Sequence, residues 1–141
     1  MKRARVLIGE DDEGACGVLC DLLEPEYDVV GVVRDGRAAL ESARDHCPDL
    51  VLLDIGLPLV RGVAVARALK RTMPLVRIIF VTVHSDPAYV REALRIGVDG
   101  FLLKSRVAVD LIPAVRQVLD GRAYHPLIQN SEADFRNHFG C

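Results

Sequence analysis

The chain has 141 residues, of which half are hydrophobic and 27% are charged, and its formal net charge is −2. This length and balance are typical of one folded domain and exclude a disordered or collagen-like chain. The slight negative charge gives no general attraction to nucleic acid. No apolar run approaches the ~20 residues that span a bilayer, and no signal-length segment follows the amino terminus, so we expect a cytoplasmic protein without membrane contact.

Short apolar runs alternate with amphipathic stretches over roughly the first 120 residues. The amphipathic stretches repeat at helical spacing and stop at Pro25, Gly97 or Gly121, which are typical helix ends. The apolar runs lack the alternation of a half-exposed strand and therefore indicate a buried parallel sheet. We expect five strands, at residues 5–9, 28–33, 50–54, 77–82 and 100–104. The prediction is a doubly wound (βα)5 three-layer sandwich over residues 4–121.

The four cysteines show no metal-ligand or disulfide pattern. No CxxC pair occurs, and no histidine follows at zinc-finger spacing. We therefore expect reduced thiols at Cys16, Cys20, Cys47 and Cys141, and we expect Cys16 and Cys20, four residues apart on a helix, to pack beside the core rather than to have a redox role.

Acidic residues follow two of the predicted strands. Glu10 and Asp11 come directly after the first strand, and Asp54 ends the third. In strand order 2-1-3-4-5 these strands are neighbours, so their carboxylates repel one another unless a cation lies between them. Mg²⁺ suits such a site because it prefers few carboxylates, water and phosphate oxygens. Alternatively, Asp11 or Asp12 only caps the first helix, and Asp54 only begins a turn.

The fourth and fifth predicted strands end in Thr82 and Lys104. Taken alone, Thr82 is a good strand former and Lys104 a solvated strand end. Together with the carboxylates, however, a hydroxyl and an ammonium at one edge of the sheet supply the groups needed to transfer and hold a phosphoryl group.

Four motifs then appear in order along the chain and resemble the receiver domain of two-component response regulators, most closely the LuxR/NarL/FixJ type that precedes a helix-turn-helix effector. They are Ile8-Gly9-Glu10-Asp11-Asp12, Asp54-Ile55-Gly56-Leu57-Pro58 with Gly62, Val81-Thr82, and residues 97–104 ending in Lys104. The resemblance covers about residues 4–121. It implies the flavodoxin-like (CheY-like) fold with a five-stranded parallel sheet in the order 2-1-3-4-5.

The resemblance also implies the site. Asp54 would accept a phosphoryl group from a sensor histidine kinase, and Thr82 and Lys104 would bind the phosphoryl oxygens. Mg²⁺ would be held by Glu10, Asp11, Asp54 and the backbone carbonyl of Gly56. Apart from catalysing its own phosphorylation and dephosphorylation, such a domain is not an enzyme.

A switch is implied as well. Thr82 and Phe101 would couple phosphorylation to the surface of helix four, strand five and helix five, although Phe101 could simply be core. Gly56 and His84 would set the hydrolysis rate, or His84 is a solvent-facing loop residue. Ser105 stands where many relatives have proline, which puts a cis peptide after Lys104 in doubt.

Residues 122–141 are too few for an effector domain. The chain is therefore either a stand-alone receiver acting through protein contacts, or part of a transcription regulator whose DNA-binding domain lies elsewhere. The tail could be a linker stub, or a short helix from Ser131 that carries Phe135 and Phe139 and docks on the domain or on a second copy in a homodimer.

Two other functions are compatible with parts of this pattern. A magnesium-dependent phosphatase of the haloacid dehalogenase type also uses an aspartate nucleophile at a strand end. That class needs a second aspartate two residues later, where this chain has Gly56. A receiver-like module that binds partners without phosphorylation is the other alternative, and the complete set of polar residues argues against it.

Overall fold

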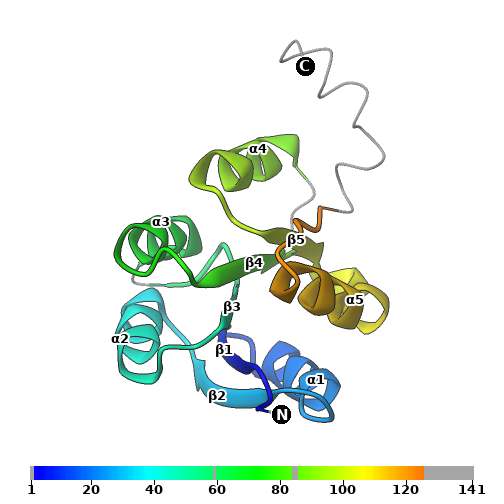
Figure 1. Ribbon diagram of the computed structural model, residues 1–141. Helices are drawn as coiled ribbons and strands as arrows, with labels where there is room; N and C mark the ends of the chain where they lie inside the picture. The colour runs from blue at the N-terminus through cyan, green and yellow to red at the C-terminus, as the bar shows by residue number, and fades with distance from the viewer. Residues whose placement is uncertain (1, 59, 84–85, 126–141) are drawn as a thin grey trace.

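The computed structural model describes residues 2–58, 60–83 and 86–125 of the chain. Five parallel strands form one sheet in the order β2-β1-β3-β4-β5, as the sequence predicts (Figure 1). The strands are β1 Arg5–Gly9, β2 Asp28–Val33, β3 Leu50–Leu53, β4 Arg77–Thr82 and β5 Gly100–Leu103. The helices are α1 Glu13–Leu23, α2 Gly36–His46, α3 Gly62–Thr72, α4 Pro87–Ile96 and α5 Val107–Leu119, with a short 3₁₀ turn at Lys104–Arg106.

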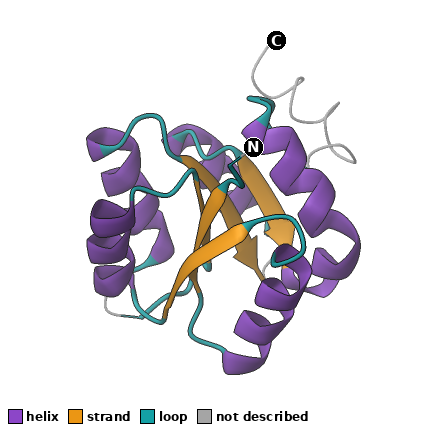
Figure 2. Ribbon diagram, turned by 60° about the horizontal axis from the view of Figure 1, so that its bottom comes forward, coloured by secondary structure: helices purple, strands orange, loops and turns teal. Residues whose placement is uncertain are grey.

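The helices cover both faces of the sheet, which makes three layers (Figure 2). Alternate strand residues belong to two separate buried clusters. Leu7 of β1 packs in the cluster that holds α2, α3 and α4, whereas its neighbours Val6 and Ile8 pack in the cluster that holds α1 and α5. Both faces of the central strands are therefore apolar, which explains why the sequence shows runs rather than alternation.

Two predicted strands are one residue too long. Asp54 and Lys104 follow β3 and β5 instead of ending them. The backbone turns at both residues, because the Asp54 carboxylate accepts a hydrogen bond from the amide of Gly56, and Lys104 begins the 3₁₀ turn. Both side chains consequently lie just beyond the carboxyl edge of the sheet.

Aspartates begin the first two helices. Asp12 accepts a hydrogen bond from the Ala15 amide, and Asp35 accepts one from the Ala38 amide. Such caps satisfy amides that have no partner within the helix. Of the two residues for which the sequence leaves a capping role open, Asp11 and Asp12, it is Asp12 that caps α1.

Several predictions concern the end of the chain. The short helix from Ser131, with Phe135 and Phe139, lies outside the described residues. Among the residues described, no helix is both long and apolar enough to cross a bilayer. No peptide bond in this part of the chain is cis, so Ser105 follows Lys104 through a trans bond.

Candidate functional site

The pairing of β1 with β3 brings two acidic residues to the same edge. Gly9 is in register with Leu53, and the amide of Asp54 donates to the Gly9 carbonyl at 2.9 Å. Glu10 and Asp54 follow these paired residues directly. Parallel pairing therefore places their carboxylates side by side, as the sequence predicts.

Glu10, Asp11 and Asp54 form one cluster of carboxylates. An oxygen from each lies within 4.8 Å of the others. The exposures differ: the side chain of Glu10 is 1% exposed and that of Asp54 is 13% exposed, while Asp11 is open to solvent. This cluster is therefore anchored in the protein on one side and accessible from solution on the other.

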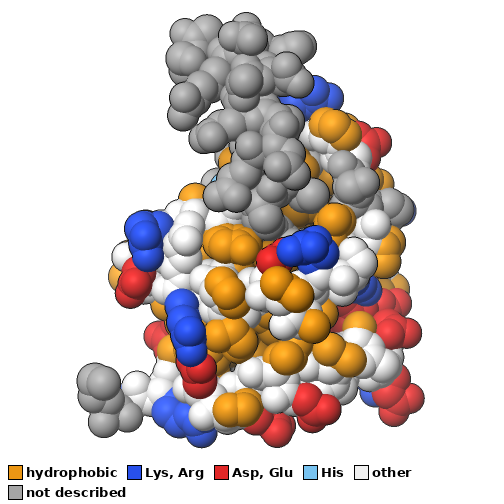
Figure 3. Space-filling model, turned by 90° about the vertical axis from the view of Figure 1, so that its right-hand side faces the viewer, with side chains coloured by type: hydrophobic (Ala, Val, Ile, Leu, Met, Phe, Trp, Pro, Cys, Tyr) orange, Lys and Arg blue, Asp and Glu red, His pale blue; other side chains and the backbone are white. Residues whose placement is uncertain are grey.

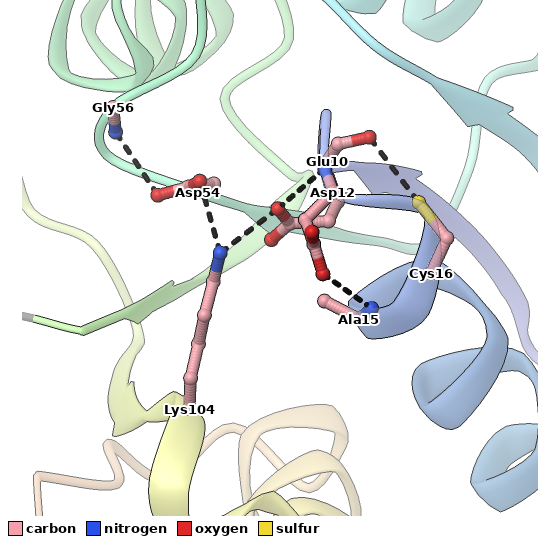
Figure 4. Close-up of polar contacts among 7 residues, drawn as sticks. All are labelled: Glu10, Asp12, Ala15, Cys16, Asp54, Gly56 and Lys104. Atoms are coloured by element: carbon pink, nitrogen blue, oxygen red, sulfur yellow. Dashed lines mark hydrogen bonds and ion pairs between the residues drawn. The ribbon is translucent and has the colours of Figure 1, made fainter.

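Lys104 reaches the cluster from the end of β5 (Figure 4). Its Nζ lies 2.8 Å from Glu10 Oε1 and 3.2 Å from Asp54 Oδ2, and it donates a hydrogen bond to each. Burial alone would lower the pKa of Lys104, but these two bonds and the two negative charges raise it above the ordinary value. Lys104 therefore carries its positive charge at neutral pH.

One ammonium does not neutralise three carboxylates, so a formal charge of −2 remains in the cluster. Burial, reinforced by the charge of Asp54, raises the pKa of Glu10 above its ordinary value. Glu10 Oε2 is buried and has no hydrogen-bond partner among the described residues. A buried oxygen without a donor, next to excess negative charge, fits a hard divalent cation such as Mg²⁺.

The loop after β3 is held close to Asp54. The Gly56 amide donates to Asp54 Oδ1 at 3.0 Å, and the Gly62 amide donates to the Ile55 carbonyl at 3.0 Å. A Cβ atom at Gly62 would lie only 2.3 Å from the Asp54 carbonyl oxygen. The close return of the chain at the start of α3 thus requires glycine and fixes the backbone around Asp54.

Thr82 and Phe101, two of the other predicted site residues, are buried in the sheet. Thr82 is 1% exposed and is in register with Leu103, the residue before Lys104. Phe101 is fully buried and contacts Phe80 edge to face, with ring centroids 6.4 Å apart. His84 lies outside the described residues.

The structure adds two contacts that hold Glu10. The amide of Asp12 donates to Glu10 Oε1 at 3.1 Å, and the Sγ of Cys16 donates to the Glu10 carbonyl at 3.2 Å. Sequence reasoning expected Cys16 only to pack beside the core. The turn between β1 and α1 decides this contact, and nothing in the spacing of the cysteines indicates it.

Comparison with known proteins identifies the family. The sequence profile of the response regulator receiver domain matches residues 6–116. The chain belongs to this family. It is 39% identical over 110 residues to the transcriptional regulatory protein DegU of Brevibacillus brevis, an alignment that covers 77% of the chain and 47% of DegU. It is 36% identical over 125 residues to the probable transcriptional regulatory protein NarL of Mycobacterium tuberculosis, covering 86% of the chain and 57% of NarL.

Solved structures of response regulators support the same family assignment. The signal receiver domain of the putative response regulator NarL from M. tuberculosis superposes with a TM-score of 0.81 at 35% identity, covering 86% of this chain and all of that one. A LuxR-family two-component response regulator from Aurantimonas sp. SI85-9A1 gives 0.88 at 28% identity, covering 96% and 99%. This chain is a receiver domain of the NarL/LuxR type, and it spans about half the length of the curated relatives it matches.

Proposed function

We propose that Asp54 accepts a phosphoryl group from the phosphohistidine of a sensor histidine kinase, and that this modification changes how the receiver, residues 4–121, binds its partners. One observation carries the proposal: a solvent-accessible carboxylate lies in a cluster with excess negative charge and contacts a protonated lysine. The family supports it independently.

Phosphoryl transfer mainly requires that reacting groups be positioned and that negative charge be stabilised. An Asp54 carboxylate oxygen would attack phosphorus as the bond to the histidine nitrogen breaks, and the freed imidazole nitrogen then takes up a proton. Glu10, Asp11, Asp54 and the Gly56 carbonyl would hold Mg²⁺, which supplies positive charge beside the phosphoryl oxygens. Lys104 stabilises the same oxygens from the β5 side.

Two residues would then respond to the acyl phosphate. Lys104 would exchange a carboxylate partner for a phosphoryl oxygen, and the Thr82 hydroxyl would donate to another. Charge-assisted hydrogen bonds of this kind contribute about 1.5–3 kcal/mol each. Thr82 lies in β4 and Lys104 follows β5, so their movement would alter packing around Phe101 and the surface of α4, β5 and α5. Gly56, which offers no side chain, and His84 would govern access of water to the phosphoryl group.

A kinase could approach over α1 and α5. A hollow of about 270 Å³ opens beside Glu10 and Lys104, and Val18 of α1 and Val107 of α5 are among its lining residues. Val18 is 47% exposed and Val109 is 65% exposed. Figure 3 shows hydrophobic side chains gathered on this face. An apolar surface next to the phosphoacceptor suits a protein partner.

Output would depend on what the receiver binds or is joined to. The relatives named above are transcriptional regulators, and their alignments with this chain cover 47% and 57% of their lengths, which supports action on DNA through a separate effector domain. Contact with a second receiver in a homodimer is compatible with the same role. Such a regulator would act in the cytoplasm.

The decisive experiment is intact mass measurement after treatment with phosphoramidate or acetyl phosphate and Mg²⁺. The wild-type chain should gain one phosphoryl group, and Asp54→Asn should gain none. Equal labelling of both proteins would overturn the assignment. Repeated hydrolysis of small phosphomonoesters by the wild-type chain would instead favour a phosphatase, which neither the family nor Gly56 supports.

A further inference from the structure

The segment between Glu10 and Cys16 closes on itself through hydrogen bonds (Figure 4). The Glu10 carboxylate accepts a hydrogen bond from the Asp12 amide at 3.1 Å, and the Asp12 carbonyl accepts one from the Cys16 amide at 2.9 Å. The Sγ of Cys16 completes the loop by donating to the Glu10 carbonyl at 3.2 Å. The Cys16 side chain therefore ties the first turn of α1 back to the end of β1.

The bond from Cys16 acts on the peptide group that joins two predicted metal ligands. The Glu10 carbonyl belongs to the peptide between Glu10 and Asp11, so its orientation decides where the Asp11 side chain begins. The preceding peptide is held separately, because the Glu10 amide donates to the Val33 carbonyl at 2.9 Å. Asp11 itself is open to solvent. The thiol thus holds the backbone that carries the exposed ligand.

The surroundings of Glu10 leave one polar atom for a ligand. Glu10 Oε1 accepts from the Asp12 amide and the Lys104 ammonium, whereas Oε2 is buried and has no hydrogen-bond partner among the described residues. A side chain that is only 1% exposed cannot turn this oxygen to water. Whatever orients the backbone at Glu10 therefore also orients the unpartnered oxygen within the cluster of carboxylates.

Packing fixes Cys16 in this position. Cys16, Leu19 and Leu23 are the buried residues of α1. Their spacing puts them on the side of the helix that faces the sheet, and only 7% of Cys16 is exposed. Cys20 lies one turn farther from the site and is only partly buried against the cluster shared with α5. It therefore provides a control with the same side chain in the same helix.

We propose that Cys16 is a positioning residue of the metal site: its thiol fixes the peptide between Glu10 and Asp11, so that both carboxylates are preorganised for a divalent cation. The contact stands by itself, whereas its consequence for Mg²⁺ and phosphoryl transfer rests on the proposed function. Groups that orient metal ligands typically change metal affinity by about 10- to 100-fold. Because a thiol is a weak donor, we expect a change of about five- to tenfold here.

The first test uses the whole chain without Mg²⁺. Cys16→Ala removes the donor and some volume, Cys16→Val removes the donor and adds volume, and Cys16→Ser keeps a donor. The order parameter of the Asp11 amide, measured by NMR relaxation, should be lower by at least about 0.1 in the alanine and valine variants than in the wild type and Cys16→Ser. An equally ordered Asp11 amide in all four proteins would overturn the positioning role.

Mg²⁺ binding is then measured by calorimetric titration of the same four proteins and of Cys20→Ala. The dissociation constant should rise about five- to tenfold in Cys16→Ala and Cys16→Val, and stay within about twofold of the wild type in Cys16→Ser and Cys20→Ala. Since alanine and valine change the volume in opposite directions, a loss shared by both reports the donor rather than packing. A loss in only one of them, in neither, or also in Cys16→Ser would overturn the proposal.

Phosphoryl labelling separates positioning from chemistry. With phosphoramidate at limiting Mg²⁺, Cys16→Ala should gain mass about five- to tenfold more slowly than the wild type, and at saturating Mg²⁺ within about twofold of it. Slow labelling that excess Mg²⁺ does not restore would contradict a positioning role. A wild-type chain that neither binds Mg²⁺ saturably nor gains mass would instead contradict the proposed function, while the order parameter of Asp11 still reports whether Cys16 holds the backbone.

Discussion

Two lysine–aspartate contacts lie at opposite ends of the sheet and differ in charge balance. Among the described residues, Lys104 is the one cation that contacts the cluster of three carboxylates beyond the carboxyl ends of the strands, and a buried oxygen of Glu10 lacks a hydrogen-bond partner. At the amino end of β5, Asp99 is matched by Lys70 at 2.8 Å and Arg77 at 3.6 Å and accepts a backbone hydrogen bond as well. Excess charge with an unsatisfied atom marks a site for a ligand, whereas balanced charge marks a structural contact.

The largest difference should appear when each lysine is removed. Lys104→Met takes away the ammonium that contacts Asp54, and we expect phosphoryl labelling to slow by about 100-fold, the usual cost of losing one group that stabilises developing charge. Lys70→Met is the matched control and should leave labelling within about twofold. The rates are measured by intact mass against time with phosphoramidate. Equal slowing in the two variants would remove the distinction between the two lysines.

The aspartates should differ in their effect on folding. Asp99→Ala leaves the Ile78 amide without its acceptor and leaves Lys70 with the Val76 carbonyl but no carboxylate, and we expect the free energy of unfolding to fall by about 2 kcal/mol. Asp54→Asn removes one of several like charges, so unfolding without Mg²⁺ should require at least as much free energy as in the wild type. Urea denaturation followed by circular dichroism compares them. A larger loss for Asp54→Asn would mean that its carboxylate is structural.

We expect the ionised carboxylate of Glu10 to lower the free energy of unfolding without Mg²⁺ and to strengthen Mg²⁺ binding. Its pKa is raised above 4.5 in the folded protein, so its ionised form opposes folding near neutral pH. Glu10→Gln should therefore raise the free energy of unfolding without Mg²⁺ and weaken Mg²⁺ binding by about tenfold. Calorimetric titration and urea denaturation of the same preparations report both quantities. Unchanged Mg²⁺ affinity would exclude Glu10 from the metal site.

The smallest effect is expected at a surface ion pair. Arg67 and Glu92 are 2.8 Å apart, but the Arg67 side chain is 60% exposed. Arg67→Ala should change the free energy of unfolding by less than about 0.5 kcal/mol, because water and salt screen such pairs. Urea denaturation is again sufficient, and a loss as large as that of Asp99→Ala would show that distance rather than charge balance decides these contributions.

The sequence predicts the fold well because buried parallel strands appear as continuous apolar runs, and polar residues mark their carboxyl ends. It also predicts that Glu10, Asp11 and Asp54 meet, since neighbouring parallel strands end at the same edge. It does not indicate the contact between Cys16 and Glu10, which depends on how the turn before α1 closes. Nor does it indicate the pairing of Tyr124 with β5, because backbone groups make that contact and every residue except proline offers them.

The central claim is that the carboxylates of Glu10, Asp11 and Asp54 bind a divalent cation beside the residue that is phosphorylated. Mg²⁺ titration followed by NMR amide shifts tests it most directly. The account predicts saturable shifts that are largest at residues 10–12 and 54–56, small near Asp99, and much weaker in Asp54→Asn. Shifts that do not saturate, or that are as large in Asp54→Asn as in the wild type, would contradict it.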